Sequence, residues 1–141
     1  MANVIPFSFR GELFSGTHDF SSGGDSFKLA LYTANPYTTA STVYSATSEV
    51  SASGTGYATT GNALTGNAVA YGTAVASCDF SDTEWSDASF TAAYAALYND
   101  DKSDKLCVVL DFSGNKTATN GTFKVSFPSP STAADAIISM A

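Results

Sequence analysis

The sequence has few charged residues, and very few of them are positive. Only 13% of its 141 residues are charged, and 6 lysines and arginines stand against 13 acidic residues, which leaves a net charge of -7. The six cations are scattered along the chain, whereas a surface that follows nucleic-acid phosphates needs several cations close together. We therefore predict no nucleic-acid partner, and the acidic balance mainly favours solubility.

Long hydrophobic runs are absent as well. No apolar run approaches the roughly 20 residues of a membrane-spanning helix. The amino-terminal segment, MANVIPFSFRGE, lacks the basic region followed by an apolar core that marks a secretory signal. We predict no membrane partner and a chain that is made and assembled in a cytoplasm.

Residues that commonly carry chemistry are scarce. His18 is the single histidine, and because no nucleophile or ligand set lies near it in the sequence, we predict a loop residue and not a catalytic base. Cys78 and Cys107 lie in apolar, strand-like surroundings, which predicts two buried, reduced thiols instead of a disulfide. The sequence therefore predicts no enzyme and no cofactor.

Two groups of carboxylates are candidate metal ligands. Carboxylate oxygens suit Ca²⁺, but the spacing in both groups lacks the calcium-loop pattern and its glycine. We predict solvated turns and caps at these positions, and no metal. The groups are Asp79, Asp82, Glu84 and Asp87, and Asp100, Asp101 and Asp104.

Hydroxyl-bearing and aromatic residues are abundant. The chain has 20 serines, 17 threonines, 10 phenylalanines and 7 tyrosines, and 44% of its residues are hydrophobic, which argues against disorder. A chain of this length can bury a sizeable core. We predict a mainly β protein, a single β-sandwich or barrel-like domain over residues 1–141, with a short amino-terminal helix and long loops rich in Ser, Thr and Gly.

The stretch from residue 79 to residue 128 contains the clearest strand patterns. Residues 105–112 (KLCVVLDF) form a short apolar run, typical of a strand buried on both faces. Residues 122–127 (TFKVSF) alternate apolar and polar side chains, as a half-buried strand does. Asn120 and Gly121 predict a turn between the two. Trp85, the single tryptophan, is predicted to be a core anchor and not an exposed binding residue.

Residues 89–98 (SFTAAYAALY) fit two patterns. In a helix, Phe90, Tyr94, Leu97 and Tyr98 share one face, and the alanines favour a helix. In a strand, every second residue from Phe90 to Tyr98 shares one face. We favour the strand, because the segment is short and lies between turn-like sequences.

The other elements are predicted from caps, breaks and local patterns. A short helix is expected near residues 8–16, with Ser8 as its cap and Gly16 at its end. Strands are expected at residues 27–33 (FKLALYT), at 67–77 (NAVAYGTAVAS, broken at Gly72) and at 136–140 (AIISM), the last closing the sheet. Residues 37–66 predict a long loop with a little local structure around residues 43–50.

A set of stretches follows one another in a recognisable order: FRGELFSGTHDF, SFKLALYT, SEVSASGTGYATTGNAL, DFSDTEWSDASFTAAYAALYND, KLCVVLDFSGNKTATNGTFKVSFP and AIIS. This set resembles a family of small structural proteins of tailed bacteriophages, and the resemblance runs over almost the whole chain. Its most specific part is EVSASGTGY before the tryptophan, with LDFSGNKTATNGTFKVSFP near the end. Members of such families are virion structural proteins, often head decoration or minor capsid components.

The resemblance implies a non-enzymatic virion protein, a capsid decoration or cement protein that docks on the head shell. Its expected partners are the major capsid protein or other virion subunits, with further copies of the chain forming a homo-oligomer in the virion. Its expected location is the virion, assembled in the host cytoplasm. The alternative is a tail-associated or host-surface module that binds glycans through exposed aromatic and hydrogen-bonding side chains.

Docking contacts are predicted in two segments, the amino-terminal segment through Phe20 and the low-charge loop from residue 37 to residue 66. Surface loops commonly carry recognition, and Tyr offers a large contact area with a polar tip. The alternative is that these side chains fold back over one face of the sheet. The predicted partner-binding residues are Phe7, Phe9, Phe14, Tyr37, Tyr44 and Tyr57.

Overall fold

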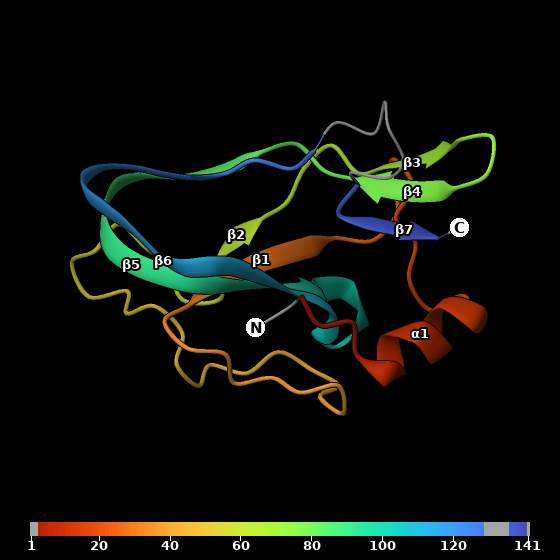
Figure 1. Cartoon of the computed structure of the whole chain (residues 1–141), viewed down its shortest axis with the longest axis horizontal. Coiled ribbons are helices and arrows are strands. Elements are labelled where there is room, and N and C mark those ends of the chain that lie inside the picture. Colours follow the sequence, from red (N-terminus) through yellow and green to blue (C-terminus); the bar gives the residue numbers. More distant parts are fainter. Residues whose placement is uncertain (1–2, 129–135, 141) are drawn as a thin grey trace.

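The chain is mainly β, as predicted. The computed structural model describes residues 3–128 and 136–140, with 46% of residues in strands and 8% in helical turns (Figure 1). The helix α1 (Phe7–Phe14) precedes the strands, and a 3-10 turn, η1 (Asp100–Lys102), connects the two longest strands. The strands are β1 (Phe27–Tyr32), β2 (Asn62–Ala63), β3 (Ala68–Tyr71), β4 (Ala76–Asp79), β5 (Thr83–Asn99), β6 (Lys105–Val125) and β7 (Ile138–Met140).

The strands form two antiparallel sheets. Their orders are β2-β1-β5-β6 and β3-β4-β7. Within the described residues neither sheet closes on itself, so the arrangement is sandwich-like and not a closed barrel. The helix α1 and the three-stranded sheet lie at the same end of the molecule (Figure 1). In the part of the chain that the structure describes, no helix is long and apolar enough to cross a membrane.

β5 and β6 form one long hairpin of 17 and 21 residues that bends back on itself. Figure 1 shows the two strands curving together at one end of the molecule and returning toward the three-stranded sheet. The pairing register shifts between Trp85 and Ala88 and between Ala92 and Tyr94, and such bulges bend a strand and increase its twist. The bend brings Trp85 into the same core as Leu29 of β1, which confirms Trp85 as a core residue.

The predicted turn at Asn120 and Gly121 is wrong, because β6 continues through both residues. Asn120 does have a positive φ of 46°, and Gly121 lies opposite Ala88 at a shift in register. The Ser89 hydroxyl accepts a hydrogen bond from the Asn120 backbone N–H at 2.9 Å. Asn120 and Gly121 therefore form a local irregularity within β6, although the sequence pattern predicted a turn there.

The strand prediction for residues 89–98 is confirmed, since this segment lies in β5 between β1 and β6. Alternate residues enter two different cores. Ala95 and Leu97 join the larger core, whereas Ala96 and Tyr98 join a smaller core on the other face. A central strand covered on both faces needs apolar residues at every position, and this explains why its pattern also fitted a helix.

The loop between β1 and β2 folds back over the sheet and supplies core residues. Val50 and Tyr57 are buried in the larger core, and Tyr37 is buried in the smaller one. The Tyr57 hydroxyl donates to Glu49 Oε1 at 2.6 Å and accepts from the Leu31 N–H at 3.0 Å. The sequence allowed two interpretations of residues 37–66: side chains that dock on a partner, or side chains that fold back over the sheet. Tyr37, Val50 and Tyr57 fold back over the sheet.

The remaining predicted elements are confirmed with small changes of boundary. α1 begins after Pro6, and Ser8 lies inside it and donates to the Ser41 carbonyl instead of capping the helix. Gly16 follows the helix with a φ of 68°, as a terminating glycine does. β3 and β4 form the strand pair broken near Gly72, and β7 pairs with β4.

Candidate docking surface at α1 and the three-stranded sheet

An aromatic residue of α1 and a bridge just before it attach the helix to the rest of the chain. Phe9 is almost fully buried, and its ring centroid lies 5.2 Å from that of His18 and 6.1 Å from that of Phe20. Just before the helix, Val4 and Val109 exchange two backbone hydrogen bonds of 2.9 and 2.8 Å. The segment before the helix is thus attached to β6, and the inner face of the helix packs on His18 and Phe20.

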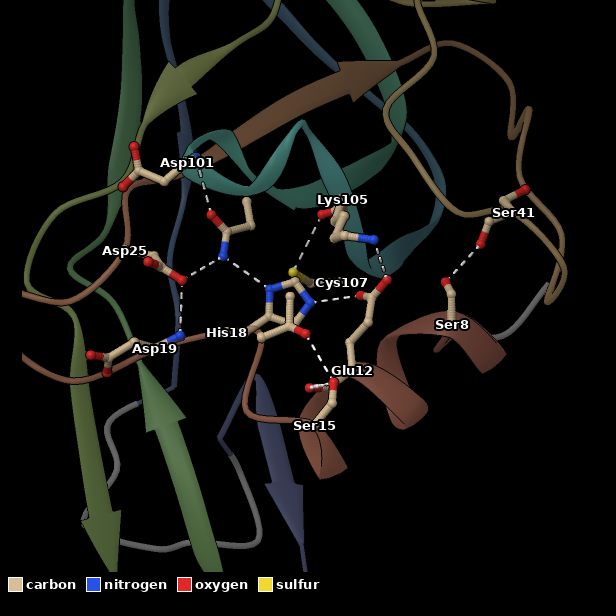
Figure 2. Close-up of polar contacts among 12 residues, drawn as sticks. Ser8, Glu12, Ser15, His18, Asp19, Asp25, Ser41, Asp101, Lys105 and Cys107 are labelled. Atoms are coloured by element: carbon tan, nitrogen blue, oxygen red, sulfur yellow. Dashed lines mark hydrogen bonds and ion pairs between the residues drawn. The ribbon is translucent and has the colours of Figure 1, made fainter.

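A buried polar cluster holds the second turn of the helix (Figure 2). Glu12 Oε1 accepts from Lys105 Nζ at 2.8 Å, and Glu12 Oε2 accepts from His18 Nε2 at 2.7 Å. Burial raises the pKa of the Glu12 carboxyl, but the hydrogen bonds from Lys105 and His18 outweigh it and leave the pKa below its ordinary value of 4.5. Glu12 is therefore held as a carboxylate between a cation and a ring N–H.

Asn99 determines which tautomer of His18 fits this cluster. Its Oδ1 accepts from the Asp101 backbone N–H at 3.1 Å, so its Nδ2 must be the donor to Asp25 Oδ2 and to His18 Nδ1, each at 2.9 Å. His18 Nδ1 is then an acceptor. The hydrogen-bond pattern assigns His18 as neutral imidazole with its proton on Nε2, donated to Glu12.

The cluster joins segments that are distant in the sequence. His18 is a loop residue, as predicted, but its side chain is fully enclosed and both ring nitrogens are engaged. Sequence reasoning missed this cluster because Glu12 and His18 join residues more than 80 positions away. A lone polar residue in a sequence gives no signal of such a distant partner.

The outer face of α1 and the adjoining sheet carry most of the exposed large apolar side chains. Phe14 is 95% exposed and Phe7 is 61% exposed, and Arg10 between them places its guanidinium 5.3 Å from the centre of the Phe7 ring. On the sheet, Tyr71 is 85% exposed and Met140 is 58% exposed. We call this surface the α1–β7 face; its exposed residues are Phe7, Phe14, Val69, Tyr71 and Met140.

Strand register explains why the sheet residues of this face lie together. Tyr71 pairs with Ala76, and Ala76 pairs with Met140, so the three form one row across β3, β4 and β7. Paired residues in antiparallel strands project to the same side of a sheet. Val69 lies two residues from Tyr71 and therefore on that same side.

A groove of about 370 Å³ lies between the helix and β7. Arg10 is the one charged residue among those that line it, and none is acidic. A smaller depression of about 120 Å³ adjoins it and extends to Val69 and Cys78. The groove is lined by Ile5, Phe9, Arg10, Leu13, Phe14, Ile138, Ser139 and Met140.

The structure places the predicted partner-binding residues in two kinds of environment, exposed or partly exposed and buried. Phe7 and Phe14 are exposed, and Tyr44 is half-buried, with its hydroxyl donating to Glu49 Oε2 at 2.5 Å. Phe9, Tyr37 and Tyr57 are buried, so their side chains do not lie on the surface of the folded chain. Their environments are apolar cores, where a large aromatic side chain buries the most surface.

The α1–β7 face also contains residues that the sequence analysis did not select. Met140 belongs to the apolar segment 136–140, which was interpreted only as a strand closing the sheet. Val69 and Tyr71 belong to the segment 67–77 and were likewise interpreted as strand residues. The exposed side of an edge strand cannot be recognised until its neighbours are known.

A second depression, of about 430 Å³, follows the bend of β6. Phe112, Thr117 and Thr122 line it together with Lys116 and Lys124. Among the described residues, Lys116 is the one lysine with no carboxylate within ion-pair distance, whereas Lys124 Nζ lies 3.0 Å from Asp82 Oδ2. This depression therefore combines an aromatic ring, hydroxyls and a free cation.

The cysteines are buried, and several of the carboxylates that the structure describes are engaged in ion pairs. Cys78 and Cys107 are free and buried, as predicted, and burial raises the pKa of the Cys78 thiol to about 12 and also raises that of Cys107. Over residues 3–128 and 136–140, no three His, Cys, Asp or Glu residues are grouped to hold a metal ion. Asp82 and Asp100 instead pair with Lys124 and Lys28.

Comparisons with known proteins add no relative. No protein-family model, curated protein or solved structure matches this chain.

Proposed function

We propose that this chain is a non-enzymatic virion structural protein of a tailed bacteriophage, a capsid decoration or cement protein that docks on the head shell. The observation that carries the proposal is the α1–β7 face, where Phe14 is 95% exposed at the edge of an apolar groove and Phe7 is 61% exposed on the same helix. Large exposed apolar patches mark interaction sites on soluble proteins. The order of sequence stretches that resembles small phage structural proteins supports the same role.

The geometry of the face suits a docking role. Burying one Phe side chain stabilises a complex by about 1.5–3 kcal/mol, and anchors of this kind dominate interface energetics. The polar cluster around Glu12 holds the helix from behind, so its outer side chains are presented on a fixed element. A prearranged surface loses less conformational entropy on binding.

The test is binding of the purified chain to head shells that lack it. The wild-type chain should co-sediment with the shells, and the double substitution Phe7→Ser and Phe14→Ser should reduce the amount bound at least about tenfold. Val43→Ser is the control, because Val43 is 48% exposed but lies outside the face. Unchanged binding of the double variant, with an unchanged melting temperature, would contradict docking through this face.

The second candidate function is a tail-associated or host-surface module that binds glycans. The depression along β6 favours it, because an aromatic ring, hydroxyls and Lys116 are the groups that contact an acidic sugar. An array of neutral and acidic glycans tests it, with Lys116→Gln as the variant and Lys28→Gln as the matched control. Binding of acidic glycans that Lys116→Gln abolishes would favour this function, as would a few copies per virion in place of many.

A further inference from the structure

We infer that Asn120 is a site of spontaneous covalent modification in the folded chain, where its side-chain amide becomes a carboxylate through a cyclic imide with the Gly121 nitrogen, assisted by the Ser89 hydroxyl. Asn120 is the one asparagine of the sequence that is followed by glycine. Because glycine has no side chain, it leaves the backbone nitrogen after an asparagine more accessible than other residues do. The inference concerns the chemistry of the chain itself and does not depend on the proposed function.

The backbone at Asn120 is released from regular strand pairing. Gly121 lies opposite Ala88 in β5. The preceding pair joins Ala118 to Phe90, so Asn120 has no pairing residue in β5. Asn120 also has a positive φ of 46°, and its side chain is exposed. An unpaired residue at a bulge is less constrained than one in a continuous ladder, so the Asn120 side chain can turn toward the nitrogen of Gly121.

Ser89 polarises the group that is attacked. Its hydroxyl donates to Asn120 Oδ1 at 3.2 Å and accepts from the Asn120 backbone N–H at 2.9 Å. A donor on a carbonyl oxygen stabilises the negative charge that develops there when a nucleophile adds to the carbon. Space for the ring is also present, because a methyl group on the Gly121 Cα would have its nearest neighbour, the Thr119 carbonyl oxygen, at 3.6 Å.

The reaction needs only water from the solvent. The Gly121 nitrogen bonds to Asn120 Cγ, and its proton leaves with the side-chain amide group as ammonia. Water then opens the ring at one of its two carbonyl carbons and gives aspartate or isoaspartate. Either product is one unit more negative than the chain's net charge of -7. Isoaspartate also adds a carbon to the backbone of β6, which should disturb pairing with β5 at this point.

The experiment is storage of the full chain in a warm, mildly alkaline buffer, followed by isoelectric focusing and mass spectrometry of the peptide that contains Asn120. A species with one additional negative charge should accumulate, with the change at Asn120. Asn115 is the internal control, because it is exposed in the same strand but precedes Lys116, and it should stay unchanged. Gly121→Ala should slow the conversion at least about tenfold, since its methyl group shields the nitrogen. That methyl group meets no close neighbour, so the melting temperature should match the wild type.

Ser89→Ala separates the contribution of the fold from that of the Asn-Gly sequence. In the folded chain this substitution should slow the conversion about fivefold, the effect of one hydrogen bond on the barrier. In denaturant, wild type and Ser89→Ala should convert at the same rate, because the contact to Asn120 is then lost. Two results would overturn the inference: a folded wild type that keeps its charge while the unfolded chain converts, or a folded Ser89→Ala that converts as fast as the wild type.

Discussion

At the scale of single residues, buried hydroxyls and carboxylates fasten the long loop and the helix to the sheets. Glu49 illustrates this, because its two oxygens accept from Tyr57, Thr60 and Tyr44. Burial, together with the hydrogen bond to Glu49, raises the pKa of the Tyr57 hydroxyl, which stays protonated as a donor. These contacts turn a Ser- and Thr-rich segment into an ordered cover of the sheet.

Removing one such hydroxyl should therefore cost stability. Tyr57→Phe leaves the buried Leu31 N–H without its acceptor and removes one donor from Glu49. We expect the free energy of unfolding to fall by about 1–3 kcal/mol, measured by denaturant unfolding. Tyr71→Phe is the matched control, because Tyr71 is largely exposed, and it should change stability little. Equal stability of the two variants would contradict this role for Tyr57.

At the scale of elements, α1 owes its position to tertiary contacts. It has 8 residues and no side-chain hydrogen bond at its amino-terminal cap, and isolated helices of that length are not stable in water. Phe9 attaches the helix by packing in the core. Glu12 attaches it through hydrogen bonds from Lys105 and His18. The helix is therefore the element whose local stability should depend most on the polar cluster.

The substitution Glu12→Gln tests this dependence. Because both oxygens of Glu12 accept from donors, a glutamine must turn its NH₂ toward either Lys105 or His18. We expect amide hydrogen exchange in α1 to accelerate by at least about tenfold, while exchange in β5 stays unchanged. Glu84→Gln on the exposed side of β5 is the control. Unaltered protection of α1 would contradict this dependence of the helix on Glu12.

At the scale of the whole molecule, acidic groups of the polar cluster join segments far apart in the chain. Asp25 lies before β1 and accepts from Asn99 at the end of β5, while Lys102 Nζ lies 3.4 Å from Asp25 Oδ1. Burial raises the pKa of Asp25, but the hydrogen bonds from Asp19, Asn99 and Lys102 leave it below the ordinary 3.8. The pKa values of Glu12 and Asp25 are thus both lower in the folded chain.

The folded chain should consequently lose stability in acid. A carboxyl whose pKa is lowered by folding stabilises the protein above its unfolded-state pKa, and that contribution disappears as the pH falls through the folded-state value. With ordinary values of 4.5 for Glu12 and 3.8 for Asp25, the melting temperature should begin to fall below about pH 4.5 and continue to fall at lower pH. Glu12→Gln should show a shallower fall than Glu84→Gln between pH 5 and pH 3. Parallel curves for the two variants would be evidence against this contribution of Glu12.

The sequence by itself determined the features that depend on local pattern. The mainly β class, the short helix near residue 8, the strands at 27–33 and 67–77 and the burial of Trp85 follow from periodicity, breakers and side-chain size. Phe7 and Phe14 were also selected from sequence and are exposed. Such features can be predicted from local sequence, because the neighbours of a residue along the chain determine on which face of its helix or strand the side chain lies.

Only the tertiary structure decided which apolar residues became core and which remained outside. Tyr57 is buried because Leu31 and Glu49 satisfy its hydroxyl, and Tyr71 is exposed because β3 lies at a sheet edge. The single bent strand β6 and the Glu12–His18–Asn99 cluster likewise depend on partners distant in sequence. Burial is a property of packing between elements, so identical side chains in similar local sequences can have opposite fates.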